Sequence, residues 1–292
     1  MTRQDALQLF LLSAVWGISF LLIKWGGEVF PPLWVALLRC VFGAAVLWLA
    51  LRLGRHALPP AGLWKPLLLV AFFNNVVPWT FFAWGELSVS SNIAAILNAT
   101  TPLFTLLISL GVREIAPSAR VILGVLIGLG GVGLTVFGGL SGGHASALGV
   151  TVLAAAGLGY AVATVIAKRT LKDLNPVGLA TTQLSLAGLL LLPAALLGPA
   201  PSALTAQAVL SMLFLGVFGS GFAYLLYYGL LSRISSTQVV AVTYLLPVWG
   251  LFWGAVAGER VGVLSVVGVG VILAGLALLN LRPRRARPPV PV

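Results

Sequence analysis

The second half of this chain repeats the first. A shift of 144 residues superposes rare residue types of the two halves, and one insertion near Arg233 changes the shift to 145. The aligned pairs are Trp16 with Tyr160, Lys24 with Lys168, Pro32 with Pro176, Arg39 with Gln183, Asn98 with Thr243, Pro102 with Pro247, and Glu114 with Glu259. A long internal repeat of this kind predicts two copies of one structural unit packed against each other.

The composition places the chain in a membrane. Sixty per cent of its residues are hydrophobic, 8% are charged, and the mean hydropathy is +1.08. Apolar runs of roughly 20 residues are long enough to cross about 30 Å of hydrocarbon as helices. Because the runs are continuously apolar and do not alternate, a β-barrel is excluded. The predicted spans are 6–24, 32–53, 64–86, 91–112, 118–140, 147–168, 176–198, 206–230, 236–257 and 262–281.

Basic residues lie almost entirely on one side of these spans. If the N-terminus is cytoplasmic, fourteen of the 17 Lys and Arg residues fall in cytoplasmic segments. Lys24 and Arg260 fall outside, and Arg39 lies within a span. Cytoplasmic loops of membrane proteins carry such an excess, so both termini are predicted to be cytoplasmic. Membrane topology therefore accounts for the net charge of +11 without nucleic acid as a partner.

Five spans in each half make the two repeats inverted, because an odd number of crossings returns the chain from the opposite side. The polar link 141–145 is the predicted seam, since its Gly and Ser residues favour a flexible turn. We expect a first repeat at 1–140, the linker at 141–145, a second repeat at 146–282 and a basic cytoplasmic tail at 283–292. No loop is long enough to form a soluble domain.

Two equivalent prolines lie near the middle of the fourth and ninth spans. Pro102 and Pro247 each remove one backbone donor and tend to kink a helix. Local repair of such a kink is common in membrane helices and would leave the prolines without a role. Their equivalence under the repeat favours two hinges at mid-membrane.

Polar and aromatic side chains at mid-membrane depth are the candidates for a binding site, because burying polar groups in a bilayer is costly. Some of them could instead join neighbouring helices, and the aromatic ones could simply pack in the core. The candidate substrate-binding residues are Trp16, Asn74, Asn75, Trp79, Phe82, Asn98, Thr101, Tyr160, Tyr224 and Tyr244.

Arg39 is the one basic residue within a span, about 10 Å below its outer end at 1.5 Å per residue. A buried guanidinium needs partners. Arg39 and nearby Lys24 could together bind an anionic group of a solute. Arg39 could equally bond exposed helix carbonyls or Glu28 in a purely structural role.

The six acidic residues lie at helix ends or in loops, so none is expected at mid-membrane. An exporter of cationic drugs generally needs such an acid, and neutral, zwitterionic or anionic solutes fit better. A Gly-x-Ser-x-Gly pattern at 139–143 lacks the strand-turn-helix context of a catalytic serine. With two histidines and one cysteine in the chain, neither a metal site nor an enzyme is predicted.

Glycines concentrate in the fifth and tenth spans, including Gly124, Gly128, Gly131, Gly268 and Gly275. Small residues let helix backbones approach closely. We expect these two helices to pack against each other or the bundle, with dimerisation as the alternative.

The ten spans in inverted halves, Trp16-Gly17, Arg39 and the repeated Ser-to-Pro-to-Glu spacing resemble the drug/metabolite transporter superfamily in its EamA branch. The spacing occurs as Ser91, Pro102 and Glu114, and again as Ser236, Pro247 and Glu259. The mid-membrane aromatics are similar to those of the aromatic amino-acid exporters within that branch. The resemblance implies a central cavity among helices one, three, four, six, eight and nine, with Arg39 off the cavity helices.

The sequence therefore predicts an all-α integral membrane protein of the bacterial inner membrane. Its expected function is export of amino acids, aromatic or large neutral ones, or of related metabolites by alternating access. The alternatives are a carrier of anionic metabolites such as nucleotide sugars, and a membrane scaffold that transports nothing. Small-molecule substrate and membrane lipid are the expected partners of a monomer, without a cofactor.

Overall fold

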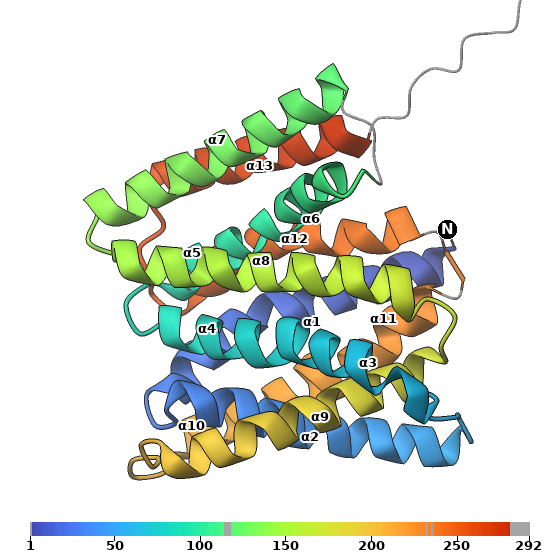
Figure 1. Ribbon diagram of the computed structural model, residues 1–292. Coiled ribbons are helices and arrows are strands. Elements are labelled where there is room, and N and C mark those ends of the chain that lie inside the picture. The colour runs from blue at the N-terminus through green and yellow to red at the C-terminus, as the bar shows by residue number, and fades with distance from the viewer. Residues whose placement is uncertain (1, 114–117, 232, 235, 281–292) are drawn as a thin grey trace, which may run out of the picture.

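The computed structural model describes residues 2–113, 118–231, 233–234 and 236–280. Glu114 and the basic tail predicted at 283–292 lie outside this range. The described chain is helical throughout (Figure 1). The first half contains α1 (Arg3–Gly27), α2 (Pro32–Leu53), η1 (Ala61–Leu63), α3 (Trp64–Ala71), η2 (Phe72–Val76), α4 (Val77–Gly85), α5 (Ser91–Asn98), α6 (Thr100–Gly111) and α7 (Ala119–Ser141). The second half contains α8 (Ala147–Thr170), α9 (Pro176–Leu197), α10 (Ala206–Gly216), η3 (Val217–Phe222), α11 (Ala223–Leu231), α12 (Ser236–Val256) and α13 (Val263–Asn280).

These elements join into the ten predicted spans. Eight continuous helical stretches have the length and apolar composition to cross a membrane, and α12 and α13 supply two shorter apolar helices. The third span runs from η1 to α4, the fourth comprises α5 and α6, and the eighth runs from α10 to α11. The observed ends lie within a few residues of the predicted ones, and the span predicted at 32–53 matches α2. The all-helical fold with ten spans is confirmed.

The helix starts follow local sequence signals. Pro32 and its equivalent Pro176 stand at the first position of α2 and α9, where the missing N–H costs nothing. Side chains of Ser118, Ser146 and Thr205 accept a backbone N–H at the starts of α7, α8 and α10. Such caps satisfy donors that a helix leaves unpaired at its first turn. Loops between the helices can therefore stay short.

Two π-helical turns interrupt the third and eighth spans at matching places. η2 covers Phe72–Val76 and η3 covers Val217–Phe222, so a shift of 144 residues makes them overlap. A π turn inserts one extra residue into an α-helix and is frequently found at functional sites. Here each turn rotates the following half-helix and directs its side chains toward the middle of the bundle.

The fourth and ninth spans differ, although both contain the predicted hinge proline. The fourth breaks at Ala99, between α5 and α6, three residues before Pro102. The ninth, α12, continues as one helix through Pro247. A break is therefore present in the first repeat alone, and the roles of both prolines as hinges remain predictions.

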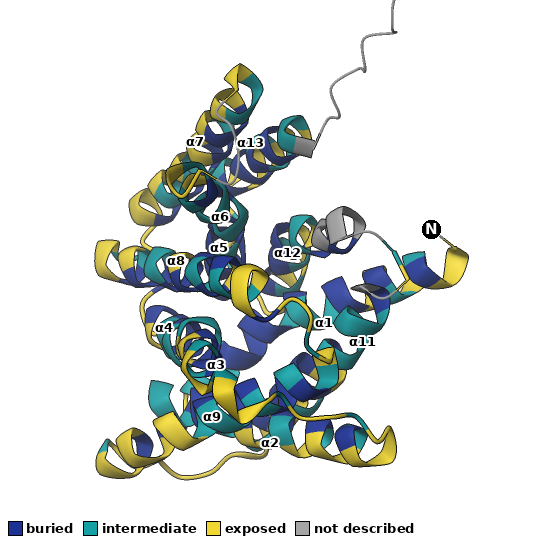
Figure 2. Cartoon of the chain, turned by 45° about the vertical axis from the view of Figure 1, so that its right-hand side comes forward, coloured by how far each residue is buried: buried dark blue, intermediate teal, exposed yellow. Residues whose placement is uncertain are grey.

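α7 and α13 form a pair at the edge of the bundle (Figure 1). A Cβ atom added to Gly131 would lie 2.6 Å from the Gly268 carbonyl oxygen, and one added to Gly275 would lie 2.6 Å from the Gly128 nitrogen. The prediction that these glycines let the fifth and tenth helices pack is confirmed. Their outward faces are exposed, as are the outward faces of α2 and α9 (Figure 2). Those faces meet lipid when the spans cross a bilayer.

The start of α1 and the end of α13 lie at the same end of the bundle (Figure 1). The distribution of basic residues assigns this inner end to the cytoplasm. At the opposite, outer end, the link predicted as a flexible seam is bonded to a neighbouring loop. Ser90 N–H donates to the His144 carbonyl at 3.0 Å, and Ser146 N–H donates to the Ser88 carbonyl at 3.1 Å.

Candidate functional site

A cavity of about 760 Å³ lies in the middle of the bundle and opens at its inner end. Its deepest walls come from α1 and α4, and its inner walls come from the end of α8 and the start of α9. The inner lining includes Lys168, Lys172 and Pro176. No residue of the outer loops lines it within the described chain. The protein is therefore closed to the outside and open to the cytoplasmic side.

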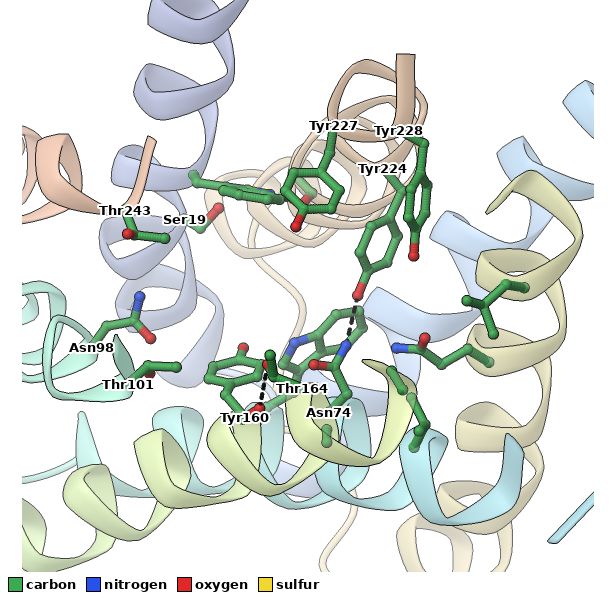
Figure 3. A pocket seen from close by; sticks show the side chains of 18 of the residues that line it. Ser19, Asn74, Asn98, Thr101, Tyr160, Thr164, Tyr224, Tyr227, Tyr228 and Thr243 are labelled. Carbon is green, nitrogen blue, oxygen red and sulfur yellow. Dashed lines mark hydrogen bonds between the residues drawn. The ribbon is translucent and has the colours of Figure 1, made fainter. Parts of the chain in front are cut away.

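Equivalent positions of the two repeats line this cavity together. Seven such pairs occur: Trp16 with Tyr160, Ser19 with Ala163, Phe20 with Thr164, Ile23 with Ala167, Arg39 with Gln183, Asn98 with Thr243, and Thr101 with Leu246. Other lining residues complete the walls, with Tyr224 and Tyr227 facing Tyr160 and Asn74 (Figure 3). The inverted repeat thus places its two copies around one common site.

Two layers close the outer end. In the inner layer, the rings of Phe20 on α1 and Phe82 on α4 meet edge to face, with 5.4 Å between centroids. One turn further outward, Lys24 Nζ lies 2.6 Å from Glu259 Oε1. The backbone N–H groups of Ser91 and Asn92 donate to the same carboxylate, each at 3.0 Å. Glu259 therefore joins α1, the start of α5 and the loop after α12.

The surroundings of Glu259 favour its charged form. Burial tends to raise its pKa, but the hydrogen bonds from Lys24, Ser91 and Asn92 outweigh that effect and leave the pKa below its ordinary value. Backbone N–H groups at a helix N-terminus bind anions well. The carboxylate is ionised at neutral pH and holds the outer closure together.

Arg39 lies in the cavity wall and is 8% exposed. Its Nε donates to Ser220 Oγ in η3 at 2.8 Å, and its Cζ lies 4.0 Å from the centroid of the Trp79 ring. Among the described residues Ser220 is its only hydrogen-bond partner, and no acid pairs with it. The aromatic face and the hydroxyl hold the guanidinium in place while leaving donors for a ligand.

A small hydrogen-bond network supports the wall beside Arg39. Asn74 Nδ2 donates to the Tyr224 hydroxyl at 3.2 Å, and Asn75 Nδ2 donates to the same oxygen at 3.3 Å. Gln183 Nε2 donates to Asn75 Oδ1 at 2.5 Å. η2, α9 and α11 are thereby joined, and the Tyr224 ring is fixed at the cavity surface.

Across the cavity, the break between α5 and α6 holds two side-chain oxygen atoms without a hydrogen-bond partner among the described residues. The Asn98 Oδ1 and Thr101 Oγ1 atoms are buried and accept no hydrogen bond within the described chain. Both residues line the cavity and lie together on the wall opposite Tyr224 (Figure 3). Buried acceptors without partners are costly, so this wall suits a ligand that donates hydrogen bonds.

The structure brings most of the predicted site residues to the cavity. Eight line it: Trp16, Asn74, Trp79, Phe82, Asn98, Thr101, Tyr160 and Tyr224. Asn75 and Tyr244 do not. Asn75 is fully buried and uses its amide to hold Tyr224 and Gln183. Tyr244 packs against the buried cluster that includes Ile96, Leu103 and Ile272, because it lies about 100° around α12 from the lining residue Thr243.

Two expectations for the basic residues need correction. Lys24 was a possible contact for an anionic solute, but it is bound to Glu259 above the cavity. Arg39 was expected off the cavity helices, yet α2 brings it to the wall, just as α9 brings its equivalent Gln183. Three further lining residues, Ser19, Thr164 and Gln183, were not predicted from residue type alone. Each is equivalent in the other repeat to another lining residue, so the repeat could have identified them.

The EamA-like transporter family matches residues 5–137 and again residues 147–281. The chain belongs to the EamA-like transporter family. The two matches fall on the two five-span halves, as an internal repeat requires. This EamA transporter is a multi-pass protein of the inner membrane, and it is a carrier rather than an enzyme.

Its relatives span nearly the whole chain. It is 29% identical to the inner membrane transporter YedA of Escherichia coli K12, over 94% of this chain and 89% of YedA. It is 26% identical to the transporter YoaV of Bacillus subtilis, over 91% and 92% of the two chains. It is 24% identical to protein PagO of Salmonella typhimurium, over 81% and 79%. None of these names states a substrate.

One solved crystal structure has the same fold, with a TM-score of 0.69 at 22% identity over 96% of this chain and 97% of the other. The geometry described above is inward-open, because within the described chain the cavity beside Arg39 and the aromatic walls is lined by residues of the cytoplasmic end and by none of the outer loops.

Proposed function

We propose that this EamA transporter exports amino acids with aromatic or large neutral side chains, and that Arg39 binds their carboxylate. The observation that carries the proposal is a buried guanidinium in an aromatic cavity, held by Ser220 and Trp79 but bonded to no acid among the described residues. Such a group binds a carboxylate through two parallel hydrogen bonds.

The other walls suit the rest of an amino acid. Asn98 and Thr101 offer acceptors for an ammonium group on the wall across from Tyr224. Trp16, Tyr160 and Tyr227 offer aromatic surface for an apolar side chain. The volume of about 760 Å³ falls within the range of about 300–1,000 Å³ typical of small-molecule sites. The complete cavity in one chain supports a monomer as the working unit.

Three basic residues on the wall favour a second candidate, a carrier of anionic metabolites. Lys168 and Lys172 lie at the inner mouth, and Arg39 lies deeper. Their field would concentrate anions there. This reading requires phosphate or a second carboxylate on the solute, whereas one guanidinium suffices for an amino acid.

Uptake into liposomes tests the proposal. We expect saturable uptake of radiolabelled tryptophan, phenylalanine and leucine by the purified protein, with little uptake of the decarboxylated amine tryptamine. The variant Arg39→Gln should reduce kcat/KM for tryptophan at least about tenfold, because a hydrogen bond to a charged group contributes about 1.5–3 kcal/mol. Arg52→Gln is the matched control, since Arg52 lies at the exposed inner end of the same helix.

Two results would overturn it. Equal transport of tryptophan and tryptamine would show that Arg39 does not recognise the carboxylate of the solute. Transport of sugar phosphates or nucleotide sugars, without transport of any amino acid, would establish the second candidate.

A further inference from the structure

Glu86 is a buried acid that the transport cavity does not use. It lies directly after α4 and is 7% exposed. Both of its carboxyl oxygens are buried without a hydrogen-bond partner in the described part of the chain. An ionised carboxylate in such a place is costly unless something neutralises it. The structure therefore raises the question of what this carboxyl binds.

The position of Glu86 places it in the outer closure. Glu86 follows Phe82 by one helical turn, with its N–H bonded to the Phe82 carbonyl at 3.0 Å. Lys24 follows Phe20 by one turn on α1 in the same way. Because the rings of Phe20 and Phe82 meet, the two charged residues lie side by side one layer further outward. The aromatic layer separates Glu86 from the cavity below.

The charged neighbours leave Glu86 without a counter-charge. α1 contributes Lys24, the loop after α12 contributes Glu259, and Arg39 on α2 lies deeper. α8, which also packs against α4, has no titratable side chain from 147 to 158, and Glu28 at the end of α1 is exposed. Lys24 is already paired with Glu259. One ammonium thus faces two carboxyl groups.

The electrostatics of the closed state agree with the presence of one ammonium group for two carboxyl groups. Burial raises the pKa of Glu86 well above its ordinary value, and the Glu259 carboxylate raises it further, while Lys24 and Arg39 oppose the shift. The carboxyl group is accordingly neutral over a range of pH in which an exposed glutamate is charged.

We propose that Glu86 is a proton-binding site of the outer closure, occupied while the closure is shut and emptied to the outside when it opens. Opening separates Lys24 from Glu259 and admits water to Glu86. The O–H bond of the carboxyl then breaks, and its proton passes to the external water. The carboxylate that remains is hydrated by the water that has entered.

The sign of the pH effect follows directly. The closed state binds one more proton than the open state, so raising the external pH favours opening. Acidic medium holds the transporter in the inward-open state. Since the aromatic layer keeps Glu86 away from the cavity, the proton returns to the side it came from and is not carried across the membrane.

Thiol labelling from outside tests the proposal without any substrate, so the outcome is independent of which solute is carried. Cys40 is the only cysteine of the chain and is replaced by Ala. Ser19→Cys then places a reporter on the cavity wall, where an impermeant maleimide added to right-side-out vesicles reaches it only through an open outer end. Ala203→Cys, in the exposed outer loop between α9 and α10, corrects for the pH dependence of the thiol itself.

Between pH 5 and pH 8 we expect the corrected labelling rate to rise, by at most about tenfold per pH unit for a single proton. Glu86→Gln should remove the rise and keep labelling slow, because the amide mimics the protonated acid. Glu86→Asp should retain the rise. Glu259→Gln should shift the rise to lower pH, because it frees Lys24 to pair with Glu86.

A wild-type rate that does not change over this range, whether the reporter reacts always or never, would overturn the proposal. So would a Glu86→Gln protein whose rate rises as much as that of the wild type. If Glu86→Gln does not accumulate in membranes, the shift expected for Glu259→Gln decides the matter, since no shift would exclude Glu86 as the titrating group.

Discussion

Equivalent lysines of the two repeats stand at the outer and inner ends of the cavity, yet the outer end is closed and the inner end is open. At the outer end Lys24 is paired with Glu259 and lies off the cavity lining. At the inner end its equivalent Lys168 lies on the lining. Glu114, the equivalent of Glu259, lies outside the described residues. The contrast teaches that two lysines at equivalent positions of the repeats can have different surroundings, so residue type alone does not decide which end is closed.

The ion pairs at the two ends are about equally buried but differ in what else the acid binds. Lys24 and Glu259 are 38% and 6% exposed, and Glu259 also accepts the backbone N–H groups of Ser91 and Asn92 at the start of α5. At the inner end, Arg233 Nε lies 3.2 Å from Asp5 Oδ1, with exposures of 47% and 7%, and Asp5 takes its other hydrogen bonds from Thr2 at the start of its own helix. The outer acid therefore joins three separate elements, so it should control the conformation more than the inner one.

The largest effect is expected for Glu259→Gln. It removes the charge from a buried site with three donors, and hydrogen bonds to charged groups contribute about 1.5–3 kcal/mol. Loss of about 2 kcal/mol would increase the open-to-closed ratio at the outer end about 30-fold. Labelling of Ser19→Cys from outside measures this ratio. An unchanged rate would mean that Glu259 does not hold the closure.

A smaller effect is expected for Pro102→Ala, which tests whether the break in the fourth span lets the two ends move separately. Alanine restores a backbone donor at 102 and favours joining α5 and α6 into one helix. We expect turnover in liposomes to fall several-fold in a folded protein. Pro247→Ala is the matched control within the unbroken α12 and should change turnover less. Equal effects would instead support two equivalent hinges.

The smallest effect is expected for Arg233→Gln. Nearly half of the Arg233 side chain is exposed, and Asp5 keeps its hydrogen bonds from Thr2 when Arg233 is replaced, so the outward labelling rate should change by less than about threefold. A change as large as that of Glu259→Gln would show that the inner pair sets the conformation as strongly as the outer pair does.

Hydropathy and the repeat predicted the fold because both signals extend over whole spans. Twenty apolar residues identify a crossing whatever their partners are, and an odd number of crossings per half determines the inversion. The π turns η2 and η3 were not predicted. In a span that is apolar on every side, one extra residue per turn leaves no change in pattern.

The site was only partly predictable, because the sequence gives the depth of a residue in the membrane but not the direction in which its side chain points. Thr243 faces the cavity whereas its neighbour Tyr244 faces α13, and only the rotation of α12 separates them. Glu86 was expected near the interface because it ends a span. Its burial depends on the way α1, α4 and the loop after α12 meet, which no single segment of sequence encodes.

The pairing of α7 with α13 has a consequence for how the protein is made. α7 is the last span of the first half, and α13 is the last span of the second. During synthesis α7 enters the bilayer with its glycine face uncovered and waits for all of α8 to α12 to be translated. At about 5–20 residues per second, that wait lasts several seconds or more. The order of biogenesis thus leaves a half-finished carrier whose first repeat must persist in lipid before its edge can be completed.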